Sequence, residues 1–204
     1  MSAAESNSDE TKAADSNLAN KVVLPREFEE RLESIKKLYP DQRSAVMPAL
    51  YLAQEYYGYI SDDAVLWVSE RVGIPPVHVR EVATFYTMFY KKPVGRYHFQ
   101  VCRTLSCAIL GARKLTDHLH SKLKILPGEV SEDGMWSYEE VECLGSCGTA
   151  PMCELNDTFF EKLTVEKLDQ IMETISSSNP DLRFSTVKDD LGDGIPGAPK
   201  SEVI

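Results

Sequence analysis

The sequence is short of basic residues and of long apolar runs. It has 22 lysines and arginines against 32 aspartates and glutamates, for a formal net charge of −10. That balance argues against nucleic acid or an anionic membrane surface as the main partner, because both bind basic faces. No run approaches the roughly 18 apolar residues of a candidate transmembrane helix, so we expect no direct membrane insertion.

No motif for nucleotide binding or catalysis occurs in a supporting context. G-x-x-x-x-G-K is absent, and the one G-x-G-x-x-G spacing, at 192–197, lies in the acidic tail rather than between a predicted strand and a predicted helix. No Ser/His/Asp or paired-carboxylate constellation stands out. We therefore expect no complete active site in this chain alone, and we assign no catalytic residues. The sequence has no C-x-x-C pair either, which argues against a thioredoxin-type dithiol.

The two ends of the sequence lack the composition of folded or targeting segments. Residues 1–20 have neither the apolar core of a signal peptide nor the basic character of a mitochondrial transit peptide. We expect a disordered tail there and a flexible acidic tail over 179–204, because such polar segments cannot offset their ordering entropy. In a cytoplasmic chain the thiols stay reduced, so clustered cysteines are more typical of metal binding or redox chemistry than of disulfides.

All five cysteines lie in one stretch. Cys102 and Cys107 form a C-x4-C pair, and Cys143 and Cys147 form a C-x3-C pair. Two close pairs from two loops supply four thiolates, which is how proteins build tetrahedral sulfur sites. Cys153, in an apolar segment, is predicted to be a buried structural residue, because a free cysteine behaves as a small hydrophobe.

Two kinds of centre fit the four paired cysteines. Structural zinc takes four cysteines with short pair spacings, although paired C-x2-C is the more usual pattern. A [2Fe–2S] cluster needs backbone N–H donors close to its sulfurs, and Gly145 and Gly148 beside Cys147 would let the backbone approach closely. Cys107 is expected to open a helix, where the dipole favours a thiolate. Spacing alone leaves both open.

Hydrophobic periodicity changes along the chain and predicts an α+β protein. Residues 21–95 are predicted to form a helical domain of about four helices. The aromatic residues Phe85, Tyr86, Phe89 and Tyr90 are expected to serve core and interdomain packing, with a subunit interface as the alternative. Residues 96–178 follow a β-α-β-β-β-α order of thioredoxin-like type. The four histidines, which are scattered, are expected on the solvated surface. The predicted strands are 97–101, 136–141, 152–155 and 158–160.

Several of these segments resemble a known family. The runs ATFYTMF at 83–89, PVGRYH at 93–98, and ECLGSCGTAPM at 142–152 are similar to the E-type, thioredoxin-like [2Fe–2S] subunit of respiratory complex I, the bacterial NADH:quinone oxidoreductase. The resemblance covers about residues 25–178. It implies an N-terminal four-helix unit followed by a thioredoxin-like [2Fe–2S] ferredoxin domain.

The resemblance also carries functional expectations. It implies a [2Fe–2S] cluster held by Cys102, Cys107, Cys143 and Cys147, which exchanges single electrons with FMN on an NADH-binding flavoprotein partner. It further implies other complex I subunits as partners and a peripheral location on the cytoplasmic face of the inner membrane. The alternatives are the equivalent subunit of an NAD-linked hydrogenase or formate dehydrogenase, and a non-redox, zinc-stapled interaction module.

Overall fold

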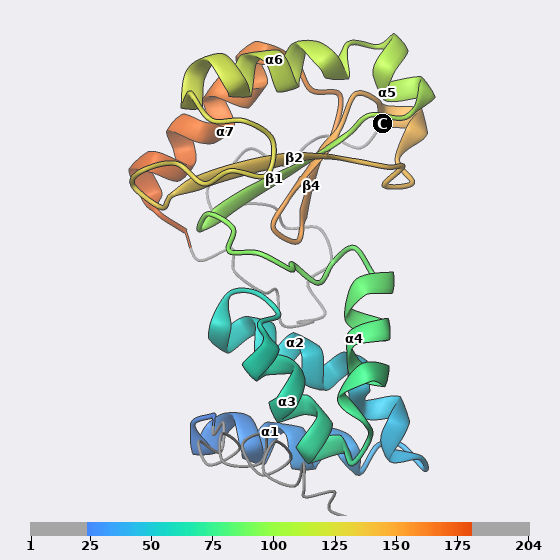
Figure 1. The fold of residues 1–204 in the computed structure, drawn as a ribbon. Helices are drawn as coiled ribbons and strands as arrows, with labels where there is room; N and C mark the ends of the chain where they lie inside the picture. Colours follow the sequence, from blue (N-terminus) through green and yellow to red (C-terminus); the bar gives the residue numbers. More distant parts are fainter. Residues whose placement is uncertain (1–23, 181–204) are drawn as a thin grey trace, which may run out of the picture. The chain divides into compact units, whose positions relative to one another are not determined.

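A computed structural model describes residues 24–180, which are coloured in Figure 1. The tail expected over 1–20, and nearly all of the tail expected over 179–204, lie outside the described residues. The chain divides into two compact units with a boundary between Thr87 and Met88. We call them the helical unit and the sheet unit. None of the helices within residues 24–180 has both the length and the apolar character that a bilayer crossing requires.

The helical unit is built from helices with clear local stop and start signals. Ser61 begins one helix, since its Oγ accepts a hydrogen bond from the backbone N–H of Ala64 at 3.1 Å. Gly58 and Gly73 each end a helix in the left-handed conformation, at φ 79° and 76°. The elements are α1 (Arg26–Lys36), the 3-10 helix η1 (Gln42–Ala45), α2 (Val46–Tyr57), α3 (Asp62–Val72) and α4 (Pro76–Phe85).

Trp67 is the largest buried side chain of the helical unit, and it is tied to two charged residues. Its indole N–H donates to Glu29 at 3.0 Å, and Arg71 donates to the same carboxylate from the next turn at 2.7 Å. The bond to Glu29 satisfies the one polar atom of the buried indole ring. Because Glu29 lies on α1 and Trp67 and Arg71 lie on α3, these bonds also join the two helices. The helical unit therefore has its own core.

The fourth helix ends earlier than its apolar spacing predicts. That spacing runs on through Tyr86 to Phe89, yet α4 stops at Phe85 and Tyr86 is already extended, with ψ 124°. Phe85 is 78% exposed, whereas Phe89 is fully buried and belongs to the sheet unit. Core packing of the aromatic run therefore holds for Phe89, whereas exposed Phe85 does not serve a core. The boundary between the units lies between Thr87 and Met88, before the predicted position at residue 95.

The sheet unit contains one four-stranded sheet in the order β2-β1-β3-β4. The pair β1–β2 is parallel, and the other two pairs are antiparallel. A parallel pair needs a crossover, which α5 and α6 provide. This arrangement confirms the α+β, thioredoxin-like prediction. The elements are β1 (Tyr97–Cys102), α5 (Leu105–Ile109), α6 (Ala112–Leu123), β2 (Trp136–Val141), the 3-10 helix η2 (Cys147–Thr149), β3 (Cys153–Leu155), β4 (Thr158–Phe160) and α7 (Val165–Ser178).

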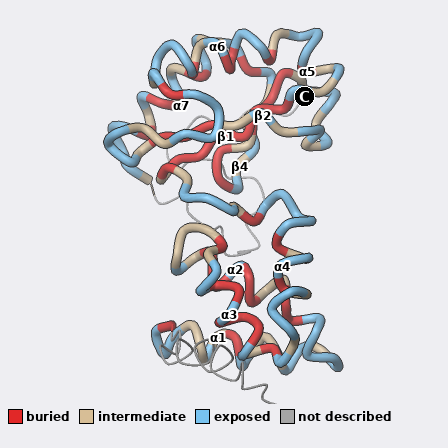
Figure 2. Tube along the Cα trace, viewed as in Figure 1, coloured by how far each residue is buried: buried red, intermediate tan, exposed pale blue. Residues whose placement is uncertain are grey.

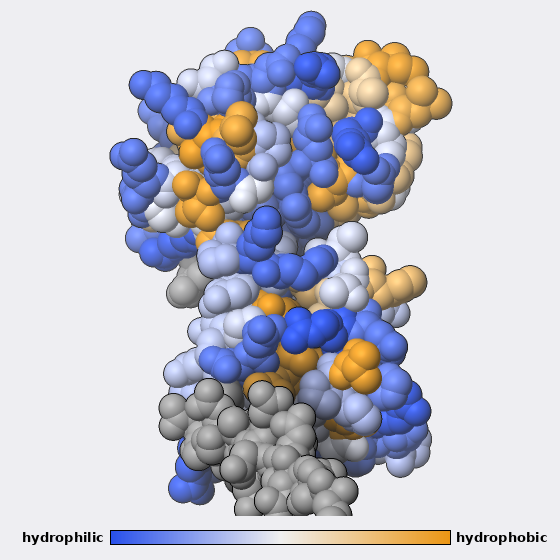
Figure 3. Space-filling view, in the orientation of Figure 1, coloured by the Kyte–Doolittle hydropathy of each residue, from blue (hydrophilic) through white to orange (hydrophobic). Residues whose placement is uncertain are grey.

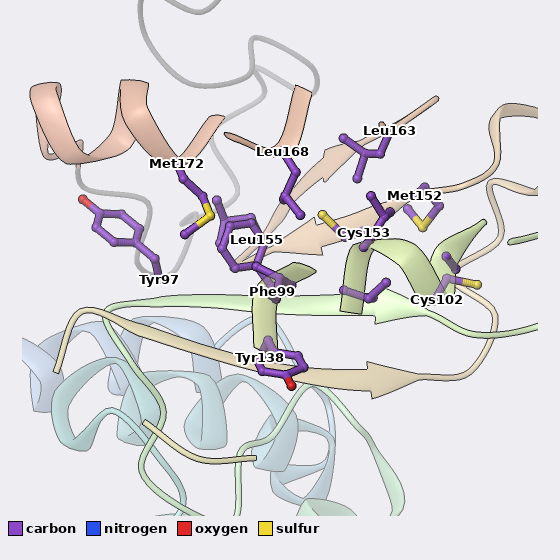
Figure 4. Packing of buried hydrophobic residues seen from close by; sticks show 14 of the residues in the cluster. Tyr97, Phe99, Cys102, Tyr138, Met152, Cys153, Leu155, Leu163, Leu168 and Met172 are labelled. Carbon is purple, nitrogen blue, oxygen red and sulfur yellow. The ribbon is translucent and has the colours of Figure 1, made fainter. Parts of the chain in front are cut away.

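One face of the sheet forms the core beneath α6 and α7, which lie on the same side in Figure 1. From β1, Tyr97 and Phe99 point into this core, and Leu168 and Met172 of α7 meet them (Figure 4). Every residue of β1 is buried, as Figure 2 shows by its unbroken red trace. The strand is therefore buried on both faces. The alternation of apolar and polar residues in YHFQV at 97–101 predicted burial of one face only.

The second face of β1 carries a polar network. The ring nitrogens of His98 lie 2.7 Å from Ser137 Oγ and 3.2 Å from a carboxylate oxygen of Glu139. Gln100 donates to the same oxygen at 2.8 Å, and the ring of Tyr90 packs edge-on against His98. His98 is only 2% exposed. The expectation that every histidine lies on the solvated surface was therefore wrong for His98, whose polar atoms find partners across the sheet.

Candidate metal centre

Both cysteine loops leave the sheet at the same end. Strands β1 and β2 run parallel with Cys102 opposite Val141, so their carboxyl ends coincide. The chain after β1 reaches Cys107 within α5, and the chain after β2 passes Cys143 before Cys147 begins η2. The sheet topology therefore brings together two cysteine pairs that are far apart in the sequence.

The sulfurs form two close pairs. The Sγ atoms of Cys143 and Cys147 are 3.4 Å apart. The thiols of Cys102 and Cys107 are close enough for each to shift the pKa of the other. Two thiolates on one tetrahedral metal, with bonds of about 2.3 Å, lie about 3.8 Å apart, so the measured pair is close to the spacing that one metal would require. All five cysteines are free thiols.

The two pairs differ sharply in exposure. Cys102 and Cys107 are each 2% exposed, whereas Cys143 and Cys147 lie on the surface. Two pairs of thiols from two loops suit a binuclear centre, in which each iron takes two thiolates. The donor set therefore fits a [2Fe–2S] cluster.

Within each pair, one thiol loses its proton more easily than the other. Burial acts against ionisation of Cys102, but hydrogen bonds from Thr104 outweigh it and lower the pKa of this thiol. Burial raises the pKa of Cys107 to about 11, and its bond to Cys102 adds to the effect. The backbone N–H of Gly145 lowers the pKa of Cys143. The hydrogen bond with Cys143 in turn raises the pKa of Cys147. Each pair thus offers one favoured thiolate for a first metal bond.

A backbone N–H group points at one of the exposed sulfurs. Gly145 donates to Cys143 Sγ at 3.4 Å, from a backbone with φ 87° that suits glycine. The backbone of Leu144 lowers the pKa of Cys102, and that of Met152 acts in the same direction on Cys107. Such donors are what a cluster with net negative charge needs.

The second cysteine loop is braced by an acidic residue that sequence reasoning missed. The carboxylate of Glu161 accepts hydrogen bonds from the hydroxyls of Ser146 and Thr149, and these bonds lower its pKa. The backbone N–H of Lys162 also donates to the Thr149 carbonyl oxygen at 2.7 Å. Ser146 directly precedes Cys147, so Glu161 holds the exposed pair in position. The sequence holds no signal for this role of Glu161, because only the fold brings the segment after β4 close to the second cysteine loop.

Cys153 has a different environment from the other four cysteines. It is 1% exposed and lies among core side chains such as Leu163 and Met152 (Figure 4). Burial strongly raises the pKa of its thiol. Cys153 pairs across the sheet with Val101, one residue before Cys102. These surroundings support the prediction that Cys153 is a core residue.

Apolar side chains surround the short helix α5 beside the sulfurs. Leu105 is 74% exposed, Ile109 73% and Leu110 58%, and these three residues form what we call the α5 patch. Figure 3 shows apolar atoms gathered where α5 lies in Figure 1. Large exposed apolar residues that cluster in this way mark interaction surfaces. The α5 patch is therefore a candidate contact surface next to the exposed cysteines.

Known proteins are similar in sequence to most of this chain. The chain is 38% identical over 149 residues to the E 2 subunit of the NADH-quinone oxidoreductase of Rhizobium meliloti, a match that spans 73% of this chain and 89% of the relative. It is 42% identical over 144 residues to NADH-quinone oxidoreductase subunit 2 of Thermus thermophilus, a match that spans 69% of this chain and 80% of the relative.

A solved structure shares the fold. The chain superposes with a TM-score of 0.58 on a chain of an NAD+-reducing [NiFe]-hydrogenase in the air-oxidised state, at 24% identity. The match covers 66% of this chain but only 23% of that chain, so it concerns the fold alone. The model of the thioredoxin-like [2Fe–2S] ferredoxin family matches residues 32–176. These similarities, together with the paired sulfurs at the end of the sheet, show that the chain belongs to the thioredoxin-like [2Fe–2S] ferredoxin family.

Proposed function

We propose that Cys102, Cys107, Cys143 and Cys147 hold a [2Fe–2S] cluster, and that the chain is the electron-transfer subunit of an NADH–quinone oxidoreductase. The observation that carries the ligand assignment is the meeting of two sulfur pairs at one end of the sheet, with a backbone N–H donor at one of the exposed sulfurs. The similarity to the Rhizobium meliloti protein, over 89% of that relative, supports the assignment to this enzyme.

The cluster supplies one-electron chemistry when it is bound. This chain's own residues hold it and control its surroundings: the backbone at Leu144, Gly145 and Met152 favours negative charge on the sulfurs, and Glu161 fixes the exposed loop. The only G-x-G-x-x-G spacing, at 192–197, does not lie between a predicted strand and a predicted helix, so NADH and FMN would bind to a flavoprotein partner. A one-electron carrier beside that flavin would separate the electrons that NADH delivers as a hydride.

The α5 patch would provide the contact with this flavoprotein partner. Electron transfer requires the exposed side of the centre to approach the flavin, and the patch lies beside that side. Leu105 follows Thr104 at the start of α5, and Cys107 lies two residues from both Leu105 and Ile109. A partner that buried these side chains would therefore exclude water from the region around the cluster. Through the complex, the chain would be peripheral to the cytoplasmic face of the inner membrane.

Metal analysis of the chain tests the proposal directly. We would purify the full chain anaerobically, assay iron and acid-labile sulfide, and record EPR spectra after reduction with dithionite. We expect about two irons and two sulfides per chain and a rhombic signal in the reduced state. A colourless protein with one zinc would refute electron transfer and would support the alternative, a non-redox interaction module stabilised by zinc. Co-purification with a quinone-reducing membrane module, rather than with a hydrogenase or formate dehydrogenase, would support the assignment to complex I.

A further inference from the structure

The side chain of Thr104 serves the sulfurs rather than the helix that it precedes. Thr104 is the N-terminal capping residue of α5, a position where threonine commonly accepts a hydrogen bond from the helix backbone. Here the side chain makes no such bond. Its Oγ1 instead lies 3.2 Å from Cys102 Sγ. The hydroxyl is thus directed at one of the proposed ligands.

The geometry at Cys102 fixes the direction of this hydrogen bond once the sulfur is a ligand. A metal-bound cysteine is a thiolate without a proton, so the hydroxyl beside it can only donate. Thr104 is partly buried, which limits competition from water for the O–H. The same hydroxyl also lowers the pKa of the Cys143 thiol in the second cysteine loop, in agreement with a donor that favours negative charge on sulfur.

We infer that Thr104 tunes the reduction potential of the centre by donating an O–H···S hydrogen bond to the cysteine sulfurs. This inference rests on the proposed [2Fe–2S] centre and its four ligands. One added electron makes the centre more negative, and a donor aimed at its sulfurs stabilises that extra charge more than it stabilises the oxidised state. The hydroxyl therefore raises the potential. Thr104 is a positioning residue and not a ligand.

Two substitutions at this position separate the hydroxyl from the packing of the side chain. Thr104→Val keeps the shape and removes the O–H, whereas Thr104→Ser keeps the O–H. The control is Thr174→Val on α7, which removes a hydroxyl bonded to the carbonyl of Gln170. The full chain with its cluster would be titrated anaerobically with dithionite while the reduced signal is followed by EPR. We expect Thr104→Val to lower the potential by up to about 59 mV, equal to a tenfold weaker hold on one electron.

The other outcomes are equally decisive. Thr104→Ser and Thr174→Val should keep potentials close to that of the unmodified chain. An unchanged potential in Thr104→Val at full iron content would overturn the inference, as would equal shifts in the valine and serine variants. If Thr104→Val fails to load iron, Thr104→Ala is measured in its place. Failure of both hydroxyl-free variants to load would mean that Thr104 serves assembly, and tuning would be rejected. A wild-type chain without iron would instead refute the proposed function itself.

Discussion

At the scale of single residues, the five cysteines differ because of where the fold places them. Cys102 and Cys153 lie on neighbouring strands and are almost equally buried, yet only Cys102 lies at a strand end with a hydroxyl directed at its sulfur. The sulfur of Cys153 is surrounded by core side chains. Burial alone therefore does not distinguish a ligand from a core residue, whereas the polar donors around the sulfur do.

Substitution of the core cysteine should leave the centre intact. Cys153→Ala removes one buried sulfur, and we expect a loss of about 1 kcal/mol of stability from the small cavity. For a chain of this size that corresponds to a fall of about 2–4 °C in melting temperature. Iron and sulfide content should stay unchanged. Cys143→Ser, the matched ligand variant, should lose or alter the EPR signal. Loss of iron in Cys153→Ala would instead identify Cys153 as a ligand.

Glu154 on β3 should make stability depend on pH. Burial raises the pKa of its carboxyl to about 7, and the nearby charge of Asp157 adds to the shift. The unfolded chain releases this proton near pH 4.5 and the folded chain only near 7, so stability falls as the pH rises between these values. Because the side chain is partly exposed, solvent screening reduces the penalty to roughly 1 kcal/mol.

The measurement is a pair of melting curves for Glu154→Gln. At pH 8 this variant should melt a few degrees above the unmodified chain, because it carries no charge to desolvate. At pH 4 the two should melt together. Glu140→Gln, which changes an exposed glutamate on β2, is the control and should show no such pH-dependent gain. Equal melting temperatures of Glu154→Gln and the unmodified chain at pH 8 would contradict the prediction.

At the scale of elements, the connection after β4 controls the second cysteine loop. Glu161→Ala removes the carboxylate that accepts from Ser146 and Thr149. Each hydrogen bond to a charged group contributes about 1.5–3 kcal/mol at most. We expect the variant to load its cluster but to release iron to a chelator about tenfold faster. Release is followed by loss of visible absorption. Glu173→Ala on α7 is the control, and an unchanged rate in Glu161→Ala would show that the loop needs no brace.

The α5 patch should decide how tightly the chain binds its flavoprotein partner. Burial of one leucine or isoleucine contributes about 1.5–3 kcal/mol, so Leu105→Asp or Ile109→Asp should weaken binding about tenfold or more. Binding to the purified flavoprotein can be measured by surface plasmon resonance with cluster-loaded chains. Leu126→Asp is the matched control, because Leu126 is 56% exposed but lies outside α5. Equal weakening by all three variants would count against a specific contact at α5.

At the scale of the whole molecule, sequence patterns predicted the helices and strands better than the contacts that individual side chains make between them. Paired spacing identified Cys102, Cys107, Cys143 and Cys147 as one set, and periodicity identified the sheet and its covering helices, because both are local signals. The burial of His98 was missed, since its partners on β2 are brought close only by strand pairing. Thr104 and Glu161 were missed for the same reason: their roles depend on contacts with a second loop.

The unequal exposure of the two cysteine pairs gives the centre a front and a back. The back, at Cys102 and Cys107, is set in the core, and the front, at Cys143 and Cys147, meets solvent. Two irons held in this way would not be equivalent. Water would stabilise negative charge at the exposed sulfurs, whereas the buried sulfurs would depend on the hydrogen-bond donors of this chain. The direction from which electrons enter and leave would then be set by the fold before any partner binds.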